Sequence, residues 1–173
     1  MNLADYIRNI PDFPRPGIQF KDITTLLQNG AAFRHVINAW RDRYADQDID
    51  AIVGAEARGL IFGAALAYAL GISFVPVRKP GKLPSETLGV EYELEYGSDS
   101  LEIHADALGK GDRVVLVDDL LATGGTMEAI VKMMNTLEVD IVEIVFLVEL
   151  TPLKGREKLQ PYAVHALIEF DEM

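Results

Sequence analysis

The sequence predicts a single α/β domain with a mostly parallel central sheet flanked by helices. Its 173 residues are 49% hydrophobic, which is enough for one core. Short, nearly continuous apolar runs such as residues 114–117 alternate with segments of helical spacing, as in sheets covered on both faces. No repeat or linker divides the chain, so we treat residues 1–173 as one domain.

The first part of the chain contains two predicted helices around a proline-rich segment. Asn2 is a helix-capping residue and Pro11 ends helical structure, so a short helix is expected between them. Residues 11–24 are rich in proline and are expected to form an ordered or partly extended loop. A longer helix is expected at residues 31–45. Its apolar side chains recur at helical spacing: Phe33, Val36, Ile37, Trp40 and Tyr44.

The remaining elements alternate between strands and helices. Apolar runs predict strands at residues 50–55, 72–78, 112–119, 140–150 and 162–170. Helices are expected at residues 58–70 and 125–138, and a loop at residues 79–89. Residues 90–97 and 100–104 alternate in polarity and predict a hairpin. Parallel sheets bind ligands beyond the carboxyl ends of their strands, so polar residues at those ends are candidates for a site.

Composition and charge exclude several classes of function. The net charge of −11 opposes binding to nucleic acid, which requires a basic surface. The chain has no cysteine, which excludes disulfides and thiolate metal sites, and it has only three histidines. We find no secretory signal and no apolar run of membrane-spanning length, so we expect a cytoplasmic protein with no membrane partner.

The segment VVLVDDLLATGGT, residues 114–126, combines an acidic pair with an anion-binding turn. Asp118 and Asp119 follow a buried strand, and a turn of small residues then opens a helix. Backbone amides in such a turn and the positive end of a helix dipole bind phosphate, while carboxylates accept hydrogen bonds from sugar hydroxyls. We therefore predict a ribose 5-phosphate site. Its turn consists of Ala122, Thr123, Gly124, Gly125 and Thr126.

A helix cap followed by an ordinary turn is the alternative interpretation of the acidic pair. The combination of strand, acidic pair and glycine-containing turn favours the phosphate site. Two other phosphate-binding loops are excluded, because the sequence contains neither G-x-x-x-x-G-K-[ST] nor a G-x-G-x-x-G that follows a strand.

The same segment resembles the signature of type I phosphoribosyltransferases that binds phosphoribosyl pyrophosphate (PRPP). Further segments resemble, in the same order, the members of that family that act on adenine. They are IPDFPRPGIQFKDIT, GAEARGLIFG, VRKPGKLP, LEYGSDSLEIH and VELTPLKGREKL. The resemblance implies a Mg²⁺-dependent enzyme of purine salvage that converts adenine and PRPP to AMP and pyrophosphate. It also implies a homodimer, which a mean hydropathy of +0.12 favours.

The resemblance places the pyrophosphate of PRPP at the turn formed by Glu56, Ala57 and Arg58. Arg58 begins a helix, where its guanidinium and the backbone amides suit a diphosphate. The family carries a cis peptide bond in this turn, which corresponds to the bond between Glu56 and Ala57. Lys79 and Lys82 correspond to further pyrophosphate ligands, and a solvated basic loop is the alternative for both lysines.

Residues 79–103 resemble the family's flexible catalytic loop, which closes over the substrates. A closed loop excludes water from the oxocarbenium-like sugar that forms as pyrophosphate leaves. Glu95 and Tyr96 correspond to the loop residues proposed for catalysis, and a carboxylate would stabilise the cationic sugar. The alternative for Glu95 is a solvated strand face, because acidic residues alternate along this segment.

Residues 1–30 are expected to supply the base pocket. By resemblance, Phe20 and Leu120 cover the two faces of a purine, and the main chain at Gln19 offers adenine one donor and one acceptor. Lys21 stands where many family members carry Arg, and the main-chain contacts do not depend on that difference. A place in the core is the alternative for Phe20.

Two other functions fit the same phosphate site. One is a sibling transferase that uses another base, such as hypoxanthine, guanine, xanthine or orotate. The other is a regulator that senses PRPP, but such repressors carry a DNA-binding domain and a basic face that this chain lacks. We expect Mg²⁺ to be held mainly by substrate oxygens and water, and we name no protein ligand for it.

Overall fold

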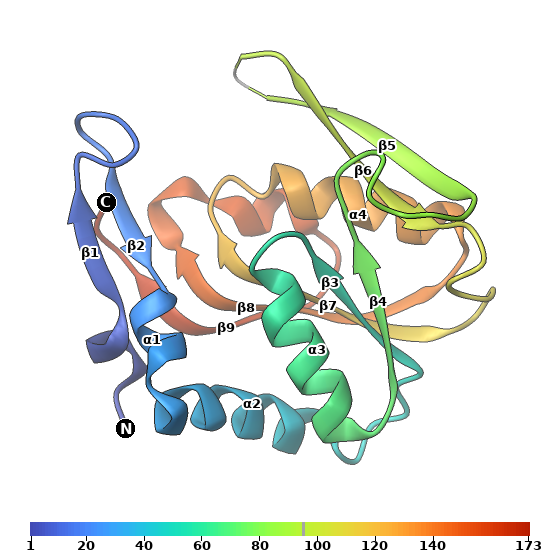
Figure 1. Cartoon of the computed structure of the whole chain (residues 1–173), viewed down its shortest axis with the longest axis horizontal. Helices are drawn as coiled ribbons and strands as arrows, with labels where there is room; N and C mark the ends of the chain where they lie inside the picture. Colours follow the sequence, from blue (N-terminus) through green and yellow to red (C-terminus); the bar gives the residue numbers. More distant parts are fainter. Residues whose placement is uncertain (95) are drawn as a thin grey trace.

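The centre of the molecule is a five-stranded sheet in which all strands are parallel (Figure 1). The computed structural model describes residues 1–94 and 96–173. In their order across the sheet, the strands are β4 (Ser73–Val77), β3 (Ala51–Ala55), β7 (Arg113–Leu121), β8 (Asp140–Leu150) and β9 (Val164–Phe170). The predicted α/β class with a parallel sheet is confirmed.

Helical elements cover both faces of this sheet (Figure 1). One face carries α2 (Gly30–Tyr44) and α3 (Gly59–Leu70), and the other carries α4 (Gly125–Thr136) and the 3-10 helix η3 (Gly155–Leu159). Side chains of β7 alternate between the two core layers: Val115 and Val117 belong to the α2–α3 layer, and Val114 and Leu116 to the α4 layer. This alternation buries β7 on both sides and explains its continuous apolar run.

The N-terminal segment differs from the predicted helix that would extend to Pro11. A 3-10 helix, η1, spans only Leu3–Tyr6, and β1 (Arg8–Pro11) then pairs antiparallel with β2 (Gln19–Asp22). So short a helix is marginal by itself, and pairing with β2 gives the backbone N–H and C=O groups of residues 8–11 their hydrogen-bond partners. The helix α1 (Thr24–Gln28), which the sequence analysis did not predict, leads on to α2.

The predicted hairpin is present, and it projects beside α4 (Figure 1). Its strands β5 (Thr87–Glu93) and β6 (Ser98–His104) pair antiparallel. The predicted bounds of the first strand were wrong: β5 begins at Thr87, inside the predicted loop 79–89, because pairing with β6 continues to His104, and it ends at Glu93 rather than at residue 97. Backbone hydrogen bonds of 2.9 and 2.8 Å between Arg78 and Glu102 join its base to the end of β4. Two residues of β6 are fully buried in the core: Leu101 and Ile103. The segment predicted as a flexible loop is therefore anchored at its base, and its motion stays a prediction.

The other predicted elements agree closely with the structure. The main difference is β7, which continues two residues beyond the predicted end to Leu121. The two aspartates, which were expected to end this strand, are therefore followed by two further strand residues. Within the described part of the chain, no helix has the length and apolar character needed to cross a membrane.

Candidate active site

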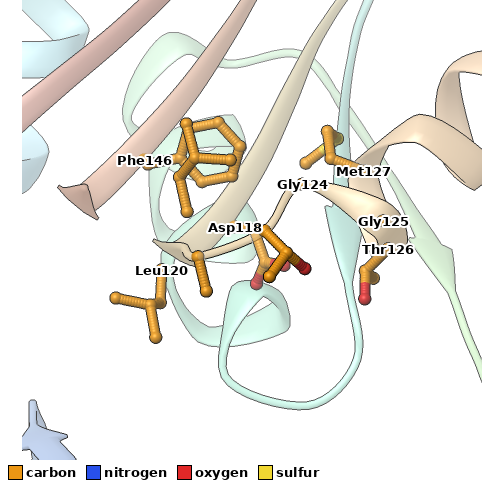
Figure 2. A pocket seen from close by; sticks show the side chains of 10 residues that line it. Asp118, Leu120, Gly124, Gly125, Thr126, Met127 and Phe146 are labelled. Carbon is orange, nitrogen blue, oxygen red and sulfur yellow. The ribbon is translucent and has the colours of Figure 1, made fainter. Parts of the chain in front are cut away.

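The turn between β7 and α4 encloses a hollow of about 90 Å³ (Figure 2). The predicted phosphate residues line it together with Asp118, Leu120, Leu121, Met127 and Phe146. Gly124 has φ of 88°, a left-handed conformation that glycine adopts without strain. Helix α4 begins at Gly125, so the positive end of its dipole is directed at the hollow. The geometry suits a bound phosphate group.

The two aspartates of β7 differ in their surroundings. Asp119 is buried, and one of its carboxylate oxygens accepts a hydrogen bond of 2.5 Å from Arg58 Nε. Asp118 is half-buried and lines the phosphate hollow (Figure 2). Burial, and then the charge of Asp119, raise the pKa of Asp118 well above its ordinary value. The pair therefore combines a carboxylate tied to a cation with one that holds its proton more tightly.

The predicted pyrophosphate turn follows β3, the neighbour of β7 in the sheet. The bond between Glu56 and Ala57 is cis, as the resemblance implies. The Glu56 carboxylate accepts hydrogen bonds from Lys79 N at 2.6 Å and from Arg78 Nη2 at 2.7 Å. The hydrogen bond from the Lys79 amide is the main cause that lowers the pKa of Glu56. Glu56 thus joins the ends of β3 and β4 and keeps the basic segment next to the turn.

Two of the three cations predicted for pyrophosphate, Arg58 and Lys79, are paired with carboxylates. Arg58 occupies the N-cap position of α3, and its side chain forms an ion pair with Asp119 of β7 rather than a capping hydrogen bond. Lys79 Nζ forms an ion pair with Asp99 of β6. Burial is the largest single influence and lowers the pKa of Lys79, but the hydrogen bond to Asp99 and the contacts with Asp99 and Tyr92 together outweigh it, so the pKa is raised. Lys82 is exposed, two residues beyond the turn at Pro80.

A second cavity, of about 480 Å³, is lined by all four residues predicted to bind the base: Gln19, Phe20, Lys21 and Leu120. It shares Leu120, Ala122 and Thr123 with the phosphate hollow, so the two spaces adjoin. Phe20 is half-buried and packs edge-to-face on the exposed Phe13, with 5.1 Å between ring centroids. Phe20 therefore lies at the cavity surface and not in the core.

Side-chain contacts hold the polar residues of this cavity in place. Gln19 Oε1 accepts a hydrogen bond of 2.8 Å from Asn9, and Lys21 Nζ donates one of 3.2 Å to the same side chain. Lys21 Nζ also lies 4.4 Å from the centroid of the Phe170 ring. Because these side chains are engaged with β1 and β9, the main chain of β2 remains the natural source of contacts to a base.

Glu95 and Tyr96 are the two residues predicted for catalysis. Glu95 lies outside the described residues. Tyr96 is 77% exposed and lines neither the phosphate hollow nor the base cavity. In the described ranges 1–94 and 96–173, no three His, Cys, Asp or Glu residues are grouped so that they hold a metal ion.

Comparisons with known proteins agree with this geometry. Residues 22–170 match the family defined by the phosphoribosyl transferase domain. An adenine phosphoribosyltransferase from Roseiflexus sp. (strain RS-1) is 59% identical, over 98% of this chain and 98% of its own length. The chain belongs to the adenine phosphoribosyltransferases.

Solved structures of this family superpose closely on the chain. The adenine phosphoribosyltransferase of Thermoanaerobacter pseudethanolicus gives a TM-score of 0.93 at 55% identity and covers 97% of this chain and 98% of its own. The Saccharomyces cerevisiae enzyme, solved with adenine and an imino-altritol bisphosphate, gives 0.90 at 43% identity and covers 95% and 96%. The chain thus has the full-length fold of these adenine phosphoribosyltransferases.

Sequence reasoning missed several residues that shape the site in this adenine phosphoribosyltransferase. Asp99 pairs with Lys79, but only the bridge between Arg78 and Glu102, which joins β6 to the end of β4, brings the two together. A Cβ on Gly59 would lie 2.7 Å from Asp118 Oδ1, so glycine lets α3 approach the acidic pair. Phe146 of β8 borders the phosphate hollow (Figure 2). Gly59, the last residue of GAEARG, could have been noticed in the sequence as a glycine at the start of a helix. No sequence signal pointed to Asp99 or Phe146.

Proposed function

We propose that the protein catalyses adenine + PRPP → AMP + pyrophosphate, a reaction of purine salvage. The observation that carries this proposal is the junction of the two cavities at Leu120, Ala122 and Thr123. A nucleoside monophosphate has a phosphate at one end and a flat apolar base at the other. The phosphate hollow and the base cavity offer those two environments side by side.

The turn after β7 binds the 5′-phosphate, and Asp118 and Asp119 accept hydrogen bonds from the ribose hydroxyls. The Glu56–Arg58 turn and the two lysines bind pyrophosphate. In the ligand-free protein, carboxylates hold Arg58 and Lys79 in place and offset their charge. Substrate phosphates then take over these cations, which localises positive charge in a protein of net charge −11.

The main chain of β2 at Gln19 selects adenine through one donor and one acceptor, and Phe20 and Leu120 cover its faces. A hypoxanthine or guanine ring presents the opposite pattern at the same atoms, so a neutral main-chain pair discriminates against it. A sibling transferase with another base preference is the second candidate. The cavity residues it would use are the same, and only the choice of base separates the two.

Residues 79–103 act as a lid that excludes water while the cationic sugar exists, and Glu95 and Tyr96 reach the site when it closes. The anchored base of β6 confines this motion to the outer part of the hairpin. The reaction requires Mg²⁺, which offsets the charge of the leaving pyrophosphate and is bound mainly by substrate oxygens and water. Asp118, which lines the hollow, is the carboxylate available beside such a substrate-bound ion.

One assay tests the function. The protein is incubated with PRPP and Mg²⁺, each base is offered separately, and pyrophosphate release is measured. We expect release with adenine, its loss on addition of EDTA and its return with excess Mg²⁺. Faster release with hypoxanthine, guanine, xanthine or orotate would favour the sibling transferase. Binding of PRPP without release for any base would favour a regulator, and full turnover in chelated samples would remove the metal requirement.

The protein acts as a homodimer in the cytoplasm. The outer face of α3 supports the dimer, because it is apolar where a helix of a monomer is usually polar. Ile61 and Tyr68 on this face are 43% and 90% exposed, and the exposed Ala64 lies between them. Sedimentation of the wild type and of Tyr68→Asp tests it: a dimer that the substitution weakens is expected, and two monomeric proteins would contradict it.

A further inference from the structure

The segment after β8 packs directly against the phosphate turn, although its residues line no part of the phosphate hollow. It consists of the 3-10 helices η2 (Thr151–Leu153) and η3, joined by Lys154. A Cβ on Gly155 would lie 2.5 Å from Ala122 O and 2.7 Å from Leu121 Cδ1. A Cβ atom does not come so close to a non-bonded neighbour, so the backbone of η3 touches the backbone of the turn.

The contact is reciprocal at the centre of the turn. A Cβ on Gly124 would lie 2.7 Å from Gly155 O. The two glycines therefore face each other, and neither position has room for a side chain. Gly124 is also the residue with φ of 88° that sets the shape of the turn. Gly155 thus supports the turn from behind, on the side away from the phosphate.

An arginine fork fixes the position of Gly155. Arg156 Nε and Nη2 bond to the Glu149 carboxylate at 2.7 and 2.6 Å, and Nη1 donates to Val164 O at 2.7 Å. Glu149 is only 3% exposed, and it pairs in register with Leu121 at the end of β7. Arg156 therefore ties η3 to the end of β8, which pairs with the strand that carries the turn, and to the first residue of β9.

We propose that Gly155 and Arg156 are positioning residues that hold the phosphate turn in its binding geometry. A phosphate bound by backbone amides depends on the place of each amide, and a loop has no ladder of hydrogen bonds to fix it. The packed glycine pair and the arginine fork supply that restraint. This inference rests on the proposed function, in that it assigns the 5′-phosphate of PRPP to the turn.

The test is Gly155→Ala, which adds one methyl group against Ala122 O and displaces the turn. A displacement near 1 Å raises the KM for PRPP by about 10- to 100-fold. The kcat at saturating PRPP and the KM for adenine change less than the KM for PRPP. Ala122 borders both cavities, but the backbone amides of the turn bind only the phosphate. Isothermal calorimetry with ribose 5-phosphate measures the same loss without turnover, as a weaker Kd.

Two control variants separate positioning from general destabilisation. Gly30→Ala is the same substitution at a helix position where a Cβ meets nothing within 4 Å, and it leaves both the Tm and the KM for PRPP unchanged. Val36→Ala removes methyl groups from a fully buried side chain in the core layer on the other face of the sheet. It lowers the Tm and leaves the KM for PRPP unchanged.

Arg156→Lys is the second variant, in case Gly155→Ala does not fold. It retains the charge but loses the fork, and we expect a KM for PRPP about 3- to 10-fold above the wild type. An unchanged KM and ribose 5-phosphate Kd in either folded variant overturns the inference, and so does an equal change in Val36→Ala. If the wild-type protein binds ribose 5-phosphate but transfers phosphoribose to no base, only the proposed function is refuted. The Kd values of the variants for ribose 5-phosphate would still test the positioning role of Gly155 and Arg156.

Discussion

Replacing Arg58 by alanine removes the partner of a carboxylate that has almost no contact with water. The Asp119 side chain is 8% exposed, and the ion pair measures 2.5 Å. Breaking a fully buried pair by removing one partner costs about 3–5 kcal/mol. The Arg58 side chain is 44% exposed, so solvent screening removes roughly half of that cost. A cation at the N-terminus of a helix is unfavourable, so removing Arg58 from the start of α3 regains about 0.5 kcal/mol of stability.

We therefore expect Arg58→Ala to lower the free energy of unfolding by about 1–2 kcal/mol. In a chain of this size, that change lowers the Tm by about 2–8 °C. Arg41→Ala is the matched control, because Arg41 is equally exposed, at 43%, but its partner Asp42 is 70% exposed. The control should change the free energy of unfolding by less than about 0.5 kcal/mol.

Thermal and urea denaturation of the ligand-free proteins measure these differences. Adding Asp119→Asn to Arg58→Ala should recover part of the loss, because the amide leaves no buried charge beside Asp118. Equal losses in Arg58→Ala and Arg41→Ala would refute the reasoning. A further loss on adding Asp119→Asn would refute it as well, since the cost would then not come from an unpaired carboxylate.

Asp118→Asn should raise the Tm at neutral pH while it weakens PRPP binding. Because the pKa of Asp118 is raised in the folded protein, its contribution to the free energy of unfolding falls as the pH rises from the ordinary aspartate pKa through the raised one. A Tm of Asp118→Asn at or below that of the wild type at pH 7 would contradict this. Gly124→Val should lower both the Tm and the affinity for PRPP, because a Cβ there meets Gly155 O at 2.7 Å; a folded variant with an unchanged KM for PRPP would remove the phosphate assignment. Amide exchange in residues 79–103 should slow when PRPP and an adenine analogue bind, and equal exchange in both states would remove the lid. Glu95→Gln should lower kcat by about 10²-fold or more with little change in the KM for PRPP, and wild-type turnover would exclude Glu95 from the mechanism.

The regular elements of the fold could be predicted from the sequence because they depend on local patterns. Apolar runs buried on both faces predicted the strands of the sheet, and helical spacing predicted α2. The helices α3 and α4 were expected between these strands, and the structure contains both. The prediction was wrong at the N-terminus, where Arg8–Pro11 pairs with Gln19–Asp22. Pairing across a turn is a non-local interaction, and a window of a few residues does not contain it.

The sequence by itself also predicted where the site lies, since the acidic pair stands near the end of a buried strand and the ATGGT turn follows that strand. Only the tertiary structure decided which groups meet there. Arg58 reaches Asp119 across 61 residues of sequence, and Lys79 reaches Asp99 across 20. The backbone of Gly155 supports Gly124 from a third segment. Strand order and register create these contacts. The periodicity of the sequence shows which face of an element a side chain occupies, but it does not show which distant segment packs against that face.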